Sequence, residues 1–202
     1  FGEKSMNSNN QDLKNITKES ITQSLLRLME TKEYKDISIS SICELAGVSR
    51  NAFYRNYPAK DAILRQYMYE ITDLWRRQLR TVKNLTAKQY FTTIFAETGK
   101  QKELIRMLHK AQVEYLLIDV IFTFFRNFTL HTSQVHYYQC HFAGSFHAMV
   151  IHWIMNEQPE TPEELGSLMC KFNHIAPTTR INLPDPIAIE DLMTISTFTY
   201  RN

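Results

Sequence analysis

Apolar residues recur along the chain at intervals of three and four, which is the spacing of one face of an α-helix. Stretches with this pattern are separated by short polar breaks, and the sequence holds only 5 glycines and 6 prolines among its 202 residues. Scarce breakers favour long helices over a strand-and-turn architecture. The pattern predicts an all-α fold of about nine helices, near residues 15–29, 38–46, 49–57, 60–82, 86–98, 102–110, 111–128, 133–156 and 161–172.

The polar breaks carry specific helix start and stop signals. Ser38 and Ser49 are placed to cap the second and third helices, and Gly47 between them suits the left-handed turn that ends a helix. Pro58 stops the third helix. Thr161, followed by proline and a glutamate at the capping-box position, opens the last helix.

These signals divide the chain into four parts. Residues 1–14 are polar and aperiodic, and we expect a disordered arm or a tag remnant. Residues 15–59 form a three-helix head and residues 60–172 a larger helical body. Residues 173–202 show no clean period, and the pattern leaves them unplaced.

Composition narrows the function classes. The net charge is only +2, so a nucleic-acid partner has to show as a local basic surface rather than in the total. The three cysteines, at positions 43, 140 and 170, form no disulfide framework and favour a reducing compartment. No signal peptide and no apolar stretch of about 20 residues is evident, so we expect a cytoplasmic protein with no membrane partner.

Catalytic and metal-binding patterns are weak. His136 with Cys140, and His147 with His152, lie four and five residues apart, but a zinc site needs three or four ligands on a defined scaffold. No nucleophile elbow, phosphate loop or zinc-protease motif appears. We therefore expect no metal, no cofactor and no enzymatic activity.

The span 38–57 reads as helix, glycine turn, helix. If its apolar residues face inward, the second helix presents outward the side chains of Arg50, Asn51, Tyr54 and Arg55. Arginine offers paired donors to guanine and asparagine pairs with adenine, so this mixture suits a DNA major groove. A structural helix-turn-helix inside a helical protein remains the alternative.

The body holds many aromatic residues that could enclose a ligand. Simple core packing is the stronger interpretation for any one of them, and Asp119 has either a structural or a polar pocket role. The candidate pocket residues are Tyr90, Phe91, Phe95, Met107, Tyr115, Asp119, Phe122, Tyr138 and Phe142.

Two stretches resemble a known family. The run DISISSICELAGVSRNAFYRNYPAKDAIL closely resembles the DNA-binding signature of the TetR/AcrR transcriptional regulators. The run YYQCHFAGSFHAMVIHWIMNEQPETPEELGSLM resembles, more weakly, the C-terminal domain of the branch that contains dihydroxyacetone-kinase regulators.

The first resemblance implies roles for particular residues. It places Ser49 near a phosphate as the cap of the recognition helix, and it brings Arg50, Asn51 and Ala52 to the bases. It implies backbone contacts for the remaining residues, which are Ser38, Tyr54, Tyr57 and Lys60.

The resemblance also implies a homodimeric regulator, most often a repressor, on a pseudo-palindromic double-stranded DNA operator. An effector in the body would control DNA binding. The last two helices would form the dimer interface, with Phe146, Val150, Trp153, Leu165, Leu168, Met169 and Phe172. The alternatives are a regulator or activator whose body binds a protein co-regulator, and a helical module or enzyme that does not bind DNA.

Overall fold

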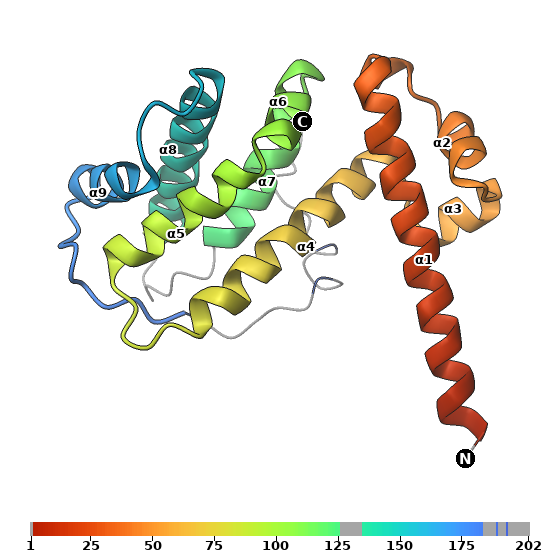
Figure 1. Ribbon diagram of the computed structural model, residues 1–202, viewed down its shortest axis with the longest axis horizontal. Helices are drawn as coiled ribbons and strands as arrows, with labels where there is room; N and C mark the ends of the chain where they lie inside the picture. The colour runs from red at the N-terminus through yellow and green to blue at the C-terminus, as the bar shows by residue number, and fades with distance from the viewer. Residues whose placement is uncertain (1, 126–134, 184–188, 190–192, 194–202) are drawn as a thin grey trace. The chain divides into compact units, whose positions relative to one another are not determined.

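The computed structural model describes residues 2–125, 135–183, 189 and 193. Within these ranges the chain forms nine α-helices and one short 3-10 helix, so the all-α prediction is confirmed (Figure 1). The fold separates into two compact units, residues 1–67 and 68–202. No helix within the described ranges combines the length and the apolarity that a bilayer crossing requires.

The first unit, which we call the head, is built on helix α1. It contains α1 (Gly2–Thr31), the 3-10 helix η1 (Tyr34–Asp36), α2 (Ile39–Ala46), α3 (Arg50–Asn56) and the first turns of α4 (Lys60–Arg80). Its core consists of fully buried aliphatic and aromatic side chains, namely Ile21, Leu25, Ile42, Phe53, Ile63 and Leu64.

The predicted caps of the two short helices are confirmed. The Ser38 hydroxyl accepts the backbone N–H of Ser41 at 3.0 Å, and the Ser49 hydroxyl accepts that of Ala52 at 3.1 Å. Gly47 has φ +67°, the left-handed conformation that glycine adopts at little cost. The helix-turn-helix geometry therefore follows directly from three residues of the sequence.

Helix α1 corrects the expectation of a disordered arm. It begins at Gly2, not near residue 15. Residues 3–14 contain no proline or glycine that would stop a helix. Their polarity removes the apolar stripe that a sequence pattern detects, but polarity alone does not prevent helix formation.

The boundary between the units lies inside α4, after Tyr67, and not in front of it at residue 59. The first turns of α4 are part of the head because Ala62, Ile63 and Leu64 are buried. Asp61 also accepts a hydrogen bond of 2.6 Å from the Tyr34 hydroxyl. A helix start in the sequence thus does not mark a domain start.

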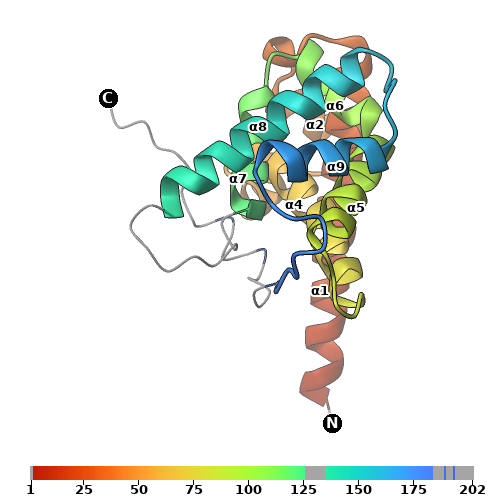
Figure 2. The ribbon, with the colours of Figure 1, turned by 90° about the vertical axis from the view of Figure 1, so that its left-hand side faces the viewer.

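The second unit, which we call the body, contains the end of α4 and five more helices: α5 (Ala87–Lys100), α6 (Lys102–Lys110), α7 (Glu114–Phe125), α8 (Val135–Met155) and α9 (Pro162–Phe172). Helix α5 packs along α9, and α7 packs along α8 (Figure 2). Aromatic rings fill the space between them. The centroids of Phe95 and Phe146 lie 4.9 Å apart, and those of Phe125 and Phe146 lie 5.4 Å apart.

Glycine allows α5 and α9 to approach closely. A Cβ atom placed on Gly166 of α9 would lie 2.5 Å from the Thr92 Oγ1 atom and 2.8 Å from the Thr92 backbone nitrogen of α5. No real Cβ atom fits at such a distance from a helix backbone. The small-residue requirement at this contact is therefore steric.

The segment after α9, which the sequence pattern left unplaced, closes the start of α5. The backbone N–H groups of Ala87 and Lys88 donate to the carbonyl oxygens of Thr179 and Pro177, at 2.7 and 3.1 Å. Thr86 caps the same turn with a capping box, as predicted. These bonds satisfy donors that a helix start otherwise leaves open.

Candidate functional site

The exposed face of α3 gathers most of the predicted DNA-contacting side chains. Ser49, Asn51, Tyr54 and Arg55 line a shallow, open hollow on the head, and Arg50 is exposed beside them. On the opposite side of the helix, Phe53 is completely buried. The structure therefore brings these polar groups together on one accessible surface.

Packing under α3 holds this surface in place. The ring of Phe53 contacts that of Tyr54 edge-on at 5.5 Å, and it contacts that of Tyr57 at 6.2 Å. At the end of the helix, the Asn56 amide donates to the Ala52 carbonyl at 2.7 Å. A helix of seven residues is marginal alone, so its geometry depends on these contacts.

The side chains on this surface have the donors and acceptors that base-edge recognition needs. An arginine donates two parallel hydrogen bonds to guanine, and an asparagine both donates to and accepts from adenine. Serine and tyrosine hydroxyls bind phosphate oxygens. Ser38 is exposed as well, while Ala52 is half-buried on the flank of α3.

Tyr57 is placed differently from the prediction. It is 2% exposed, and its hydroxyl lies 3.3 Å from the Thr22 hydroxyl of α1. A buried ring of this kind cannot reach a DNA backbone without leaving the core. The Tyr57 ring packs against the buried side of α3. This position corrects its assignment as a phosphate contact.

Lys60 is also engaged inside the head. Its ammonium donates to the carbonyl oxygens of Tyr34 and Ile37, the latter at 3.0 Å. The same ammonium lies 4.3 Å from the centroid of the Tyr34 ring. The structure therefore makes Lys60 a clamp on the connection between α1 and α2, which corrects its assignment as a free phosphate ligand.

We expect Lys60→Met to destabilise the head without changing how DNA binding depends on salt. Loss of the clamp removes the Lys60 donor from the Ile37 carbonyl, whereas the Tyr34 carbonyl keeps the Ile37 N–H at 3.2 Å, and we expect a cost of about 1–2 kcal/mol in the free energy of unfolding. A phosphate contact would instead lower the slope of log affinity against log salt by about one. Thermal unfolding and DNA titrations at several salt concentrations distinguish the two, with the exposed Lys100→Met of the body as the control.

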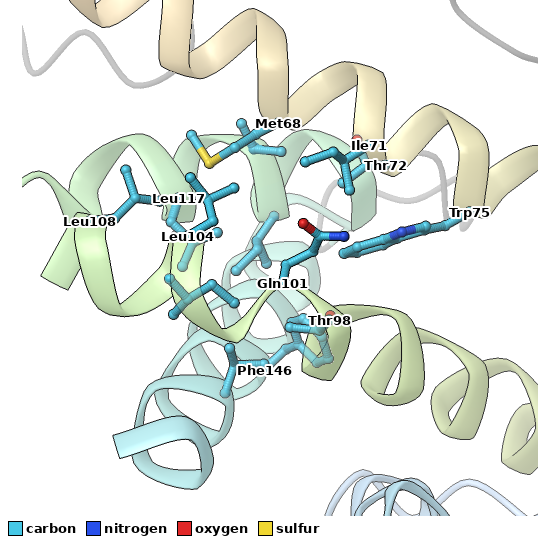
Figure 3. Close-up of a pocket in the computed structure, with 14 residues that line it drawn as sticks. Met68, Ile71, Thr72, Trp75, Thr98, Gln101, Leu104, Leu108, Leu117 and Phe146 are labelled. Carbon is cyan, nitrogen blue, oxygen red and sulfur yellow. The ribbon is translucent and has the colours of Figure 1, made fainter. Parts of the chain in front are cut away.

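A second candidate site is an apolar cavity inside the body (Figure 3). Side chains from α4 to α8 surround it, and its volume is about 40 Å³, room for about three water molecules. Its lining includes Thr72, Thr98 and Gln101, but the surface that these residues present to it is apolar. The apolar side chains in its wall include Met68, Trp75, Leu104, Leu117 and Phe146.

None of the predicted pocket residues lines this cavity. Tyr90, Phe91, Phe95, Phe122 and Phe142 are buried in the packed core. Tyr115 is 50% exposed, Met107 and Asp119 are half-buried, and the Tyr138 side chain lies outside the described residues. These residues stay a prediction as ligand contacts, because aromatic content locates a core but not the place where packing leaves a void.

The predicted dimer residues also face largely inward. Phe146 and Val150 line the cavity, and the Trp153 indole donates to the Glu160 carbonyl at 2.9 Å. Leu165 and Met169 are buried in the same unit. The remaining two are accessible: Leu168 is half-buried and Phe172 is 59% exposed. The apolar stripes of α8 and α9 mark their core faces, so most of these residues are corrected from interface to core.

Arg76 of α4 is a half-buried charge in the body. Its guanidinium donates to the Thr123 carbonyl at 3.2 Å and lies 5.0 Å from the centroid of the Phe124 ring. Burial lowers the pKa of Arg76 from its usual value, but a guanidinium remains protonated inside a protein. The cation therefore stabilises the C-terminal end of α7.

The histidines do not form a metal centre in the described part of the chain. No three histidine, cysteine or acidic side chains come together there in a way that could hold an ion. Burial lowers the pKa of His147 despite the opposing effect of Glu114, which favours the neutral ring. His109 contacts Glu114, which is a local pair between α6 and α7.

Known proteins contain domains similar to the head of this chain. A helix-turn-helix with an exposed, polar second helix defines the class of helix-turn-helix DNA-binding proteins. Residues 21–67 match the signature described as "Bacterial regulatory proteins, tetR family". A curated relative, the "HTH-type transcriptional regulator EthR" of Mycolicibacterium smegmatis, is 45% identical over 38 residues. That match spans only 19% of this chain and 18% of the relative.

Solved structures extend the likeness to the whole fold. A TetR transcriptional regulator from Streptococcus agalactiae has a TM-score of 0.58 at 19% identity, over 83% of this chain and 98% of its own. FadR of Thermus thermophilus, a TetR-family repressor solved with lauroyl-CoA, has a TM-score of 0.51 at 14% identity, over 85% and 100%. Residues 21–67 therefore carry the DNA-binding domain described for the tetR family, and the chain shares its fold with solved TetR regulators.

The branch within the family stays a prediction. The dihydroxyacetone kinase operon activator DhaS has a TM-score of 0.49 at 12% identity, over 77% of this chain and 93% of its own. A likeness at that level carries no argument about the branch.

Proposed function

We propose that this protein is a dimeric repressor that places α3 in the major groove of a pseudo-palindromic operator. The observation that carries the proposal is the face of α3, where four polar side chains stand over a completely buried Phe53. Arg50 and Asn51 are the base-reading residues. Ser38 and Ser49 bind phosphates, together with Tyr54 and Arg55. This DNA-binding role would be carried out in the cytoplasm, without enzymatic activity.

The dimer interface is the outer face of α8 and α9. Phe172 is 59% exposed, which is unusual for a phenylalanine in a folded unit. Gly144 and Ala148 lie four residues apart on α8, and a Cβ atom placed on Gly144 would meet no atom within 4 Å. A second copy of the chain packs against this face, which brings two heads to two half-sites.

Effector control is the third part of the proposal. The body contains a cavity whose walls include α4, the helix that begins in the head. FadR, which shares this fold, was solved in complex with lauroyl-CoA. A ligand that prefers a body conformation with the wrong head spacing would release the DNA. Binding of a protein co-regulator is the competing version.

Selection of fragments of the source genome by the purified dimer tests the proposal. We expect near-physiological salt, which suppresses non-specific phosphate binding, to leave one inverted-repeat motif upstream of a few genes. Recovery of no motif by protein that is folded and dimeric would contradict operator binding. A motif without inverted symmetry would contradict the dimeric arrangement.

A further inference from the structure

We propose that a basic hollow on the surface of the body binds a small organic oxyanion, that is, a carboxylate or a phosphate joined to an apolar group. The basic hollow lies where residues 79–85, at and after the end of α4, meet residues 180–183. It is open to solvent and shares no lining residue with the apolar cavity of Figure 3. Binding at this hollow does not depend on the proposed operator binding.

Backbone hydrogen bonds hold the two sides of the basic hollow together. The Ile181 N–H donates to the Leu85 carbonyl at 2.9 Å, and Thr86 and Arg180 form an antiparallel β-bridge. Figure 1 shows the segment after α9, in blue, passing the end of α4. Leu79 and Leu85, which also line the hollow, are buried. The hollow is therefore built by the fold and does not depend on the position of one flexible side chain.

The charged side chains described around the basic hollow are all positive. Arg80 and Arg180 line it, and no aspartate or glutamate among the described residues does so. The segments that form it add to this charge. Residues 74–96 hold five arginines and lysines and no acidic residue, and residues 165–183 hold two and none. Such a surface attracts an anionic ligand group.

Asn84 orients one of the two guanidinium groups. The Arg180 guanidinium donates to the Asn84 Oδ1 atom. Because a guanidinium has donors only, the asparagine has to turn its oxygen toward it, which leaves the asparagine NH2 group as a further donor. Asn84 has φ +57°, a left-handed conformation that asparagine adopts more readily than most residues. One side chain thus positions a cation and adds a donor beside it.

The basic hollow suits both parts of an organic oxyanion. An arginine donates two parallel N–H groups to a carboxylate or a phosphate, and it has five such donors in all. Apolar side chains adjoin these donors, since Val82 is 39% exposed and Ile181 and Leu183 are half-buried. An apolar substituent on the ligand would cover them. The volume of about 320 Å³ is at the lower end of the range of about 300–1,000 Å³ for small-molecule sites.

Calorimetry with the full-length protein at near-physiological salt tests the proposal. The probes are phenyl phosphate and benzoate, with benzyl alcohol as the uncharged probe and inorganic phosphate as the probe without an apolar group. We expect at least one aromatic anion to bind about tenfold or more tightly than either control probe, because neither an exposed ion pair nor a small apolar contact contributes much alone. The tighter of the two anions identifies the ligand group as a phosphate or a carboxylate.

Arg180→Gln and Asn84→Gly are each expected to weaken binding of that anion by about fivefold or more. Glycine adopts the backbone conformation of Asn84 readily, so the second variant removes the amide without straining the loop. Arg77→Gln is the control. It removes the same kind of charge near the same end of α4, but Arg77 pairs with Asp73 at 2.7 Å and does not line the basic hollow. Salt screens its remaining effect, so we expect a change of less than about twofold.

Three results would overturn the inference: folded protein that binds neither aromatic anion, a control probe that binds as tightly as the aromatic anions, or an Arg180→Gln variant whose affinity matches that of Arg77→Gln. Circular dichroism establishes that each variant is folded, and Asn84→Gly keeps the test decisive if Arg180→Gln does not fold. Operator binding is measured separately, without probe. Intact operator binding with no anion binding overturns this inference alone, and anion binding without operator binding overturns the proposed function alone.

Discussion

Joint replacement of Arg50 and Asn51 by alanine is expected to abolish the preference for the operator over unrelated DNA. Each side chain that makes a paired contact with a base contributes about 1–3 kcal/mol of discrimination. Loss of both removes about two orders of magnitude or more in specific affinity. Both residues are exposed on α3, and neither carries the packing of the head, so the unfolding temperature should stay within a few degrees.

Fluorescence anisotropy with operator and scrambled duplexes measures this loss. The matched control is Arg27→Ala with Asn15→Ala, which removes the same side-chain types from the exposed surface of α1. We expect the control to keep the ratio of operator to scrambled affinity. An α3 variant that keeps this ratio would show that the face lined by Ser49, Asn51, Tyr54 and Arg55 does not read bases.

Gly166→Ala is expected to destabilise the body more than a single methyl group would suggest. The new Cβ atom would meet the Thr92 backbone nitrogen of α5 at 2.8 Å, so the two helices have to separate. Overpacking of this kind costs about 1–3 kcal/mol, even after the gain that alanine brings to a helix interior. Chemical denaturation followed by circular dichroism measures the change in the free energy of unfolding.

Gly144→Ala is the matched control for this effect. Gly144 also lies inside a helix, but its Cβ atom would have open space within the chain. We therefore expect it to stabilise α8 by up to about 1 kcal/mol in the monomer, so the comparison is made at concentrations below dimer formation, because Gly144 lies on the proposed dimer face. Equal effects at the two glycines would mean that the close approach of α5 and α9 does not limit side-chain size.

The local geometry of the head could be predicted from the sequence because single residues determine it. Ser38 and Ser49 cap the starts of α2 and α3, and Gly47 adopts the left-handed conformation that ends α2. The outward set on α3 followed from helical periodicity once Phe53 was assigned to the core. Tyr57 and Lys60 were misplaced because their partners, Thr22 and Tyr34, lie far away in the sequence.

The cavity could not be predicted from the sequence, because it is a void left where side chains of five helices pack together. Met68 and Trp75 belong to an ordinary apolar stripe of α4, and only their neighbours on other helices make them cavity residues. Thr98 has no distinctive sequence context, since its unpaired hydroxyl is a property of the packed state. The only local signal is Gly99, which marks the break beside Gln101.

The backbone bonds between the start of α5 and the segment at 177–181 have a consequence for the order of folding. They join positions 87 and 179, so the chain has to close a loop of about 90 residues before they form. Contacts of such long sequence separation form late, whereas the contacts of the head lie within its own 67 residues. During synthesis on the ribosome, the head can therefore fold before the segment that completes the body has been made.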